Sequence, residues 1–112
     1  MKFTISLKKN HGFKRLYNKG QSAASQYAAV YCRKNGKPYN RLGLTVSAKL
    51  GGAVQRNRIR RRLKEIYRIN EEKLTSGHDI VIVARSQSFL ADFYFLEASI
   101  LTLFKKLGII SK

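Results

Sequence analysis

One segment near the middle of the chain has to pack and yet carries a dense positive charge. The 18 residues from Gly51 to Arg68, GGAVQRNRIRRRLKEIYR, contain seven Lys or Arg and a single acid, Glu65. The apolar residues Ile59, Leu63 and Ile66 recur among these charges at the spacing of an α-helix, in which residues three and four apart share a face. Any fold that contains this helix must bury one of its sides and leave the other side positively charged.

The charged side of this helix is a continuous stripe. On a helical wheel at about 100° per residue, Asn70 joins the three apolar residues in one narrow arc. Residues on the opposite side recur at the same spacing, and they are Asn57, Arg61, Lys64 and Arg68. Arg60 lies beside them. Like charges one turn apart repel each other, so solubility alone would favour mixed Lys and Glu. Because the planar guanidinium group can bind phosphate oxygens with two hydrogen bonds, the predominance of Arg favours a phosphate-binding helix.

The overall charge also indicates a polyanionic partner. The 112 residues include 23 Lys+Arg and 6 Asp+Glu, which gives a formal net charge of +17. The excess lies in residues 1–64, which contain 17 Lys or Arg and no acid, whereas residues 65–112 contain six of each. So large a charge disfavours the compact state through self-repulsion. The length suits one domain with a modest core, so residues 1–112 are expected to form a single domain that binds a polyanion.

Other function classes are disfavoured. The first residues show no secretory signal, and no run approaches 18 apolar residues, so no membrane span is expected. Cys32 is the only cysteine, which fits a buried thiol in a protein of the reducing cytoplasm. The six acids are scattered after residue 64, a poor match to a nuclease that holds metal ions with clustered carboxylates. The sequence therefore predicts a binding protein without an active site of its own.

The remaining segments predict an α+β fold with helices packed against one sheet. Asn10 can cap a first helix that runs to about Asn18 and ends at Gly20. Strands are expected at 27–32, 41–46 and 80–84, and the last is a continuous apolar run, typical of a strand covered on both faces. The expected order is helix, two or three strands, helix, strand, helix.

Turn and capping signals set the expected boundaries. Asn35-Gly36 predicts a turn between the first two of these strands, and Ser76-Gly77 is expected to close the basic helix. Asp92 can cap a last helix that ends at Gly108. Its packing residues are expected at 4-3-4 spacing, and they are Leu96, Ile100, Leu103 and Leu107.

RNA is a better match than DNA for the partner. A helix-turn-helix protein needs a second helix a short turn away, whereas the basic helix here lies between strands. Several aromatic residues accompany the charge, namely Phe13, Tyr17, Tyr27 and Tyr31. Aromatic faces beside a basic groove suit unpaired bases, which stack on them. Each of these aromatic residues can equally be a core residue, and Tyr27 and Tyr31 are expected on one face of one strand.

The run from Lys49 to Arg61, KLGGAVQRNRIRR, resembles the RNR signature of the bacterial ribonuclease P protein component. The resemblance covers nearly the whole chain in the same order. LKK at 7–9 and FKRLY at 13–17 resemble the family's first helix, RLGLTVS at 41–47 the strand before the motif, and HDIVIVAR at 78–85 the strand after it. The chain departs from the family at Ala48 and Gly52, where basic or polar residues are common, and at Arg62, where an apolar residue is usual.

The resemblance implies both a fold and a function. The fold would be a single four-stranded mixed sheet with three helices, in the order α-β-β-β-α-β-α, with a left-handed β-α-β crossover that is rare elsewhere. The function would be that of the ribonuclease P holoenzyme, an endoribonuclease that removes the 5′ leader from precursor tRNA and produces 5′-phosphomonoesters. In that family the catalytic RNA is the catalyst, Mg²⁺ is held by RNA and substrate, and the protein carries no catalytic group.

The resemblance also assigns site residues. Contacts with the catalytic RNA would be made by Arg56, Asn57, Arg58, Arg60, Arg61, Lys64 and Arg68. A cleft between the first helix and the sheet would receive the single-stranded 5′ leader, and its residues would be Phe13, Tyr17 and Tyr31, with Lys49 nearby. Two alternatives remain open at this point. A ribosomal protein would be as small and as basic, and a self-sufficient nuclease would cut precursor tRNA without any RNA subunit.

Overall fold

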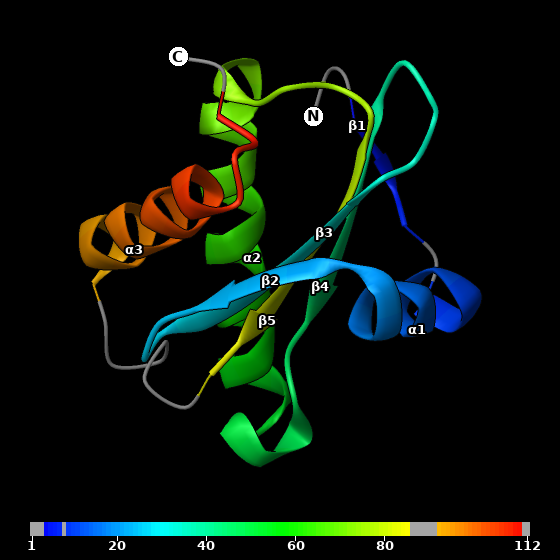
Figure 1. The fold of residues 1–112 in the computed structure, drawn as a ribbon. Coiled ribbons are helices and arrows are strands. Elements are labelled where there is room, and N and C mark those ends of the chain that lie inside the picture. Colours follow the sequence, from blue (N-terminus) through cyan, green and yellow to red (C-terminus); the bar gives the residue numbers. More distant parts are fainter. Residues whose placement is uncertain (1–3, 8, 86–91, 111–112) are drawn as a thin grey trace.

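The computed structural model describes residues 4–7, 9–85 and 92–110, and it places helices on both faces of one sheet (Figure 1). In chain order the elements are β1 (Thr4–Ser6), α1 (Lys9–Lys19), β2 (Gln21–Ala24), β3 (Ala28–Lys34), β4 (Asn40–Thr45), η1 (Ala48–Leu50), α2 (Ala53–Asn70), η2 (Glu71–Lys73), β5 (His78–Ala84) and α3 (Phe93–Lys106). The two η elements are short 3₁₀ helices. The expected α+β class and the order of the longer elements are confirmed.

The sheet has five strands in the order β1-β4-β5-β3-β2, so the expected number of four is wrong. It is mixed, because β1 pairs with β4 and β4 with β5 in parallel, while β3 pairs with both β5 and β2 antiparallel. The additional strand is β1, whose three residues are too few to show an alternating pattern. The parallel neighbours β4 and β5 are joined through α2, which makes a β-α-β unit, and its left-handed sense stays a prediction.

Polar contacts distant in sequence fasten β1 to the rest of the fold. The Thr4 hydroxyl lies 2.8 Å from the hydroxyl of Tyr67 and donates a hydrogen bond to the carboxylate of Glu71. Burial raises the pKa of Tyr67, so its hydroxyl stays protonated. Beside them, the amide of Asn40 donates to the Thr75 carbonyl at 3.0 Å. The two contacts of Thr4 join residues more than 60 positions apart along the chain, which explains why local sequence signals do not predict β1.

The expected helix boundaries are confirmed for α3 and shifted elsewhere. The Asp92 carboxylate accepts a hydrogen bond from the Phe95 amide at 2.9 Å, and Gly108 ends α3 with φ 73°. Helix α1 begins at Lys9, so Asn10 lies inside it, and the Asn10 side chain is outside the described part. The expectation that Ser76-Gly77 closes the basic helix is wrong. Helix α2 ends at Asn70, where η2 takes over, and Gly77 only turns the chain into β5.

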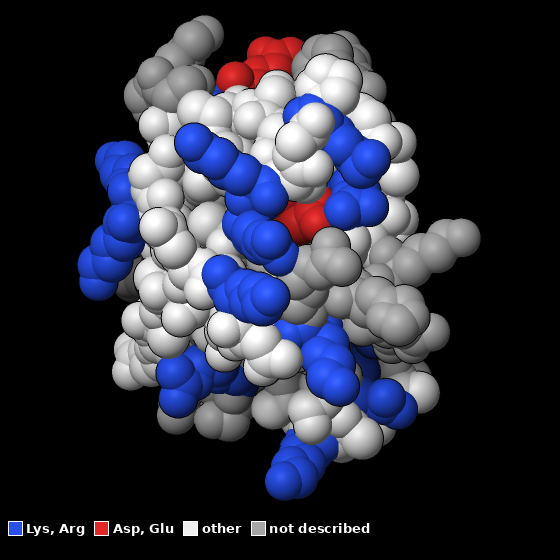
Figure 2. Space-filling model, turned by 45° about the vertical axis from the view of Figure 1, so that its right-hand side comes forward, with Lys and Arg blue, Asp and Glu red and all other residues white. Residues whose placement is uncertain are grey.

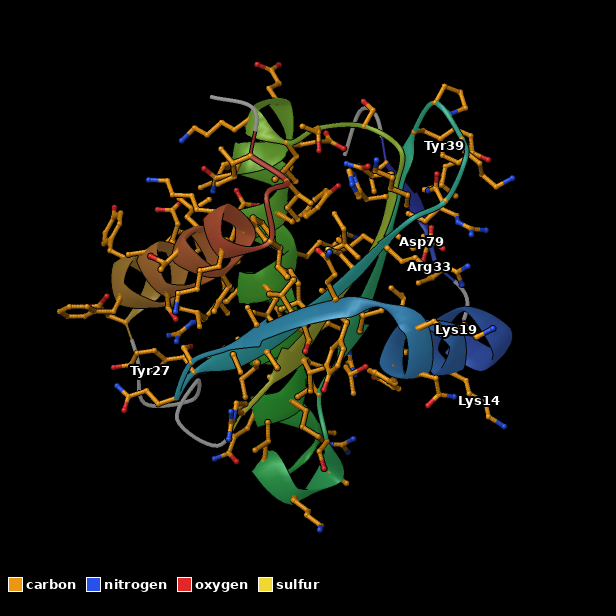
Figure 3. The ribbon with its side chains drawn as sticks, in the orientation of Figure 1. Lys14, Lys19, Tyr27, Arg33, Tyr39 and Asp79 are labelled. Carbon is orange, nitrogen blue, oxygen red and sulfur yellow. The ribbon has the colours of Figure 1, made fainter. Side chains whose placement is uncertain are left out.

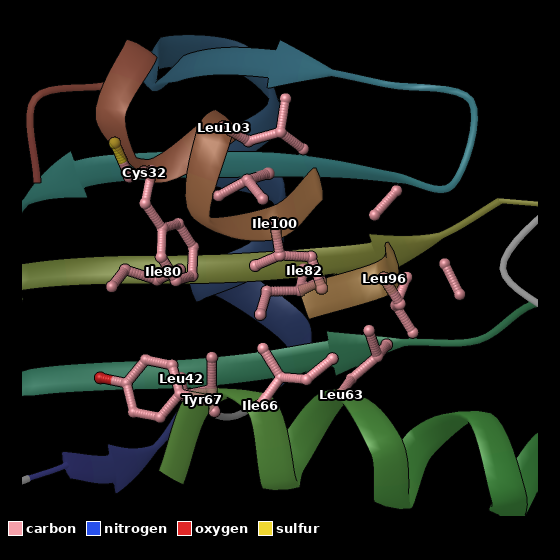
Figure 4. Packing of buried hydrophobic residues seen from close by; sticks show 14 of the residues in the cluster. Cys32, Leu42, Leu63, Ile66, Tyr67, Ile80, Ile82, Leu96, Ile100 and Leu103 are labelled. Atoms are coloured by element: carbon pink, nitrogen blue, oxygen red, sulfur yellow. The ribbon is translucent and has the colours of Figure 1, made fainter. Parts of the chain in front are cut away.

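The larger core lies between the sheet and the two helices α2 and α3 (Figure 4). The apolar stripe of the basic helix is buried as expected, with Ile59, Leu63 and Ile66 at most 1% exposed. Of the residues expected to pack from α3, Leu96, Ile100 and Leu103 are buried, and Leu107 is partly buried at the edge. Cys32 lies in the same core, where burial raises the pKa of its thiol, so it acts as a small apolar residue.

A smaller core lies on the opposite face of the sheet, under α1. It consists of the buried residues Leu7, Phe13, Leu16 and Val81. Val81 faces α1, whereas its neighbours Ile80 and Ile82 belong to the larger core. The expectation that β5 is covered on both faces is therefore confirmed.

Gly43 is the residue that lets α1 approach the sheet. A Cβ atom at this position would overlap the ring of Phe13 at its Cζ and Cε1 atoms. A glycine inside a strand often marks such a close approach between a backbone and another group. This contact places Gly43 on the face of β4 opposite Leu42 and Leu44, which pack in the larger core.

We expect Gly43→Ala to lower the free energy of unfolding by about 1–3 kcal/mol, because the added methyl group overpacks the site of Phe13. Urea unfolding would measure it. The double variant Gly43→Ala with Phe13→Leu provides the control, since Leu has no ring at the clashing position. The double variant should lose less stability than the sum of the two single variants. Simple additivity of the two losses would contradict the assigned contact.

Candidate nucleic-acid interface

Positive charge covers much of the molecular surface. Figure 2, in which the α1 side comes forward, shows Lys and Arg side chains spread over this face and Asp and Glu side chains in small patches. The largest concentration in the sequence lies on α2, whose described side chains include seven Lys or Arg and one Glu. The described structure therefore has two basic regions to consider, α2 and the surface around α1.

Helix α2 is divided into a packed side and a basic side. Its buried residues are Ile59, Leu63, Ile66, Tyr67 and Asn70, which include the whole predicted apolar arc. The exposed residues among those predicted to bind RNA are Asn57, Arg58, Arg61, Lys64 and Arg68, while Arg56 and Arg60 are half-buried. The helix thus presents cations to solvent along its length while its other side holds it to the sheet.

Contacts within α2 position some of these side chains. The Arg60 guanidinium donates to the side-chain oxygen of Asn57 at 3.1 Å. Arg68 donates two hydrogen bonds to the carboxylate of Glu65, which lowers the pKa of Glu65 and keeps it ionised. The Nε atom of Arg56 is buried, and no hydrogen-bond partner for it is found within the described structure. A buried donor without a partner is unusual in a folded protein.

Three aromatic rings meet between α1 and β3. The Phe13 and Tyr17 rings lie 6.4 Å apart, and those of Tyr17 and Tyr31 lie 4.8 Å apart, both edge to face. Phe13 is only 8% exposed, whereas Tyr17 is 43% exposed and Tyr31 is half-buried. We call Tyr17 and Tyr31, with Phe13 beneath them, the aromatic surface. The core interpretation is therefore correct for Phe13, and Tyr17 is the ring most accessible to a ligand.

Tyr27 is not part of the aromatic surface. It packs against the larger core on the other face of the sheet, so the expectation that Tyr27 and Tyr31 share a strand face is wrong. The reason is a turn before β3, in which the Ser25 hydroxyl accepts hydrogen bonds from the amides of Tyr27 and Ala28. This turn interrupts the alternation on which the expectation depended.

Sequence reasoning missed Arg33, which follows Tyr31 by two residues and so shares its strand face. Arg33 is paired in register with Asp79, and Asp79 is paired with Arg41. Arg41 donates two hydrogen bonds of 2.7 Å to the Asp79 carboxylate, which raises the pKa of Arg41. Asp79 is thus already neutralised by Arg41, and Arg33 adds positive charge beside the aromatic surface. The period of two along β3 was the signal that could have found it.

Lysines also extend from α1, the helix that carries Tyr17. Figure 3 shows Lys14 and Lys19 extending outward from α1, and Lys19 lines a cavity of about 330 Å³ together with Arg33. Lys49, the fourth residue predicted for the leader cleft, is exposed on η1, beside the start of α2. The structure thus brings Phe13, Tyr17 and Tyr31 together and places Lys49 with the basic helix.

The described residues contain no group of three or more His, Cys, Asp or Glu side chains that could hold a metal ion. Each helix in the described part of the chain is too short or too polar to span a bilayer.

The chain resembles one family in both sequence and structure. A family model described as ribonuclease P matches residues 1–108. The ribonuclease P protein component of Alkaliphilus metalliredigens is 40% identical over 111 residues, which make up 99% of this chain and 100% of the relative. The structure of the Staphylococcus aureus RNase P protein has a TM-score of 0.86 and 30% identity and covers 99% of this chain and 100% of that chain.

A second structure from the same bacterium is a mutant with defective mRNA degradation activity. It has a TM-score of 0.86 and 31% identity, and covers 96% of this chain and 90% of that chain. Because these matches in sequence and in structure extend over nearly the full length, the chain belongs to the family of ribonuclease P protein components.

Proposed function

We propose that this chain is the protein subunit of a ribonuclease P ribonucleoprotein and that α2 binds the catalytic RNA. The observation that carries the proposal is the division of α2, whose apolar side is buried in the core while its cations face outward. Cations on a fixed helix can neutralise RNA phosphates without any change in the fold.

The second part of the proposal is that the aromatic surface holds the unpaired 5′ leader of precursor tRNA. Tyr17 offers an exposed ring braced by Tyr31, and unpaired bases stack on such rings with little dependence on sequence. Lys14 and Lys19 extend outward from α1, the helix of Tyr17 (Figure 3), and Arg33 lies two residues after Tyr31 on β3, so these cations can contact the phosphates of the leader. The two surfaces together would let the protein hold both the RNA subunit and its substrate.

In this proposal the protein supplies binding and the RNA supplies the chemistry. Endonucleolytic removal of the leader would depend on Mg²⁺ held by the catalytic RNA and the substrate. Among the described residues, no three His, Cys, Asp or Glu side chains form a group that could hold Mg²⁺. The ribonucleoprotein would act in the cytoplasm on precursor tRNA. The alternative of a ribosomal protein is set aside by membership of the family.

A second candidate function has one observation in its favour. The mutant structure from Staphylococcus aureus is described by its defective mRNA degradation activity, so the family includes a protein linked to mRNA turnover. Incubating the purified chain, free of any catalytic RNA, with an mRNA would test this function here. Cleavage that persists through removal of contaminating nucleases would establish it, and intact mRNA would rule it out.

Substitutions on the two sides of α2 test the proposed function. We expect Arg61→Ala, Lys64→Ala and Arg68→Ala each to weaken binding of the catalytic RNA and to leave thermal stability nearly unchanged, because all three are exposed. Leu63→Ala should do the reverse and lower the free energy of unfolding by about 2–5 kcal/mol, because Leu63 is buried. Filter binding and thermal unfolding measure the two effects. Equal losses of stability in both sets would contradict the division of the helix.

A further inference from the structure

A groove of about 560 Å³ lies between α2 and the first residue of α3. Its lining residues are Val54, Arg58, Arg61, Arg62, Lys64, Glu65, Arg68 and Phe93. The volume is in the range of pockets that hold small organic ligands. The position of the groove along the basic helix connects it with the surface proposed to bind RNA.

The lining of the groove combines positive charge with apolar surface. Five of the lining residues are Lys or Arg, and the only acid, Glu65, is engaged by Arg68. Val54 is an apolar side chain that is 74% exposed, and the residues one turn along α2, Asn57 and Arg58, are polar or charged. Phe93 packs partly against the larger core and is also in the wall of the groove. A suitable ligand would therefore be anionic and would also offer a flat apolar surface.

We propose that this groove holds a single unpaired nucleotide of the RNA that α2 binds, with its base against Phe93 and Val54 and its phosphates on the arginines. The inference rests on the proposed function and adds which part of the RNA is recognised. A base-paired helix would present only ribose, phosphate and a shallow minor groove, because its bases are stacked inside. Such a helix would leave Phe93 and Val54 without a partner. An unpaired nucleotide matches both the charge and the apolar lining.

The groove also contains an acceptor for the edge of the base. Arg68 keeps Glu65 ionised and oriented, and an ionised carboxylate has more acceptor sites than the two hydrogen bonds from Arg68 occupy. A base with an exocyclic amino group could donate to it, as cytosine does to Glu or Asp in DNA grooves. Phe93 would therefore supply stacking, the arginines would bind phosphate, and Glu65 would orient the base.

The test compares Phe93→Leu with the matched control Phe95→Leu in complexes with the catalytic RNA. Phe95 is 67% exposed on the same helix and is not among the residues that line the groove. Stacking on an aromatic ring implies that Phe93→Leu weakens RNA binding by roughly 5- to 150-fold, while Phe95→Leu changes it less than about twofold. Acylation of ribose 2′-hydroxyls should show one unpaired nucleotide that wild-type protein protects and Phe93→Leu leaves reactive.

A second measurement uses the wild-type complex, so its result does not depend on whether Phe93→Leu folds correctly. Ultraviolet crosslinking followed by mass spectrometry should join the peptide that contains Phe93 to an unpaired nucleotide. Equal affinities and protection patterns for the two variants, or crosslinks to paired nucleotides alone, would overturn the groove assignment and leave RNA binding by α2 intact. If the wild-type protein failed to bind the catalytic RNA at all, the proposed function itself would fail.

Discussion

Raising the monovalent salt from about 50 to about 200 mM should weaken binding of the catalytic RNA by roughly 10²- to 10⁴-fold. Six to eight phosphate contacts, each contributing about 0.7 to 0.9 to the slope, give a log–log slope near −4 to −7. The number of contacts follows from the cations of α2 and from Lys49 beside it. Association constants measured across a salt series give the slope directly.

A single substitution provides the control for this salt dependence. Arg61→Ala should make the slope shallower by about one, because it removes one phosphate contact without changing the fold. Ile69→Ala, on the same helix and 45% exposed, should leave the slope unchanged because it removes no charge. A wild-type slope shallower than about −2 is incompatible with phosphate binding as the main role of α2.

Replacing Tyr17 should separate precursor tRNA from mature tRNA. Stacking of a base on an aromatic ring contributes about 1–3 kcal/mol, so Tyr17→Ala should weaken binding of precursor tRNA by roughly 5- to 150-fold. Mature tRNA has no leader to stack, so its affinity should barely change. The measurement pairs the two ligands, each with wild-type and variant holoenzyme at fixed salt and Mg²⁺.

The control for Tyr17→Ala is an alanine substitution of an exposed tyrosine on the opposite face of the sheet. Tyr94 lies on α3 and is 78% exposed, so Tyr94→Ala removes an exposed ring that has no expected contact with the leader. It should leave the ratio of precursor to mature affinity unchanged. If Tyr17→Ala also leaves this ratio unchanged, Tyr17 does not hold the leader, and a loss for both ligands together would indicate a purely structural role.

The sequence predicted most of the fold where local patterns were strong. The 4-3-4 spacing of Ile59, Leu63 and Ile66 identified the buried side of α2, and the apolar run at 80–84 identified a strand with two covered faces. Asp92 caps α3 as its side-chain chemistry predicted. The edge strand β1 was missed because it depends on the contacts of Thr4 with Tyr67 and Glu71, which no local pattern shows.

Part of the candidate site was predictable as well, because that part depends on a local sequence pattern. The basic stripe of α2 is encoded in one continuous segment, so its exposed residues could be listed from spacing alone. The aromatic surface is assembled from α1 and β3, and the sequence could not decide that Phe13 is buried and Tyr17 exposed. The place of Tyr27 depended on hydrogen bonds to the Ser25 hydroxyl. Phe93 lies 25 residues after Arg68 in the chain, and only the fold brings it beside α2.

The central claim is that this protein binds RNA and substrate while a separate RNA subunit performs the cleavage. The most direct test incubates precursor tRNA with the protein alone, with the catalytic RNA alone, and with both together, at low Mg²⁺. We predict no cleavage by the protein, slow or undetectable cleavage by the RNA, and efficient release of the 5′ leader by the two combined. Release of the leader by the protein alone, or no gain on adding the protein to the RNA, would contradict the account.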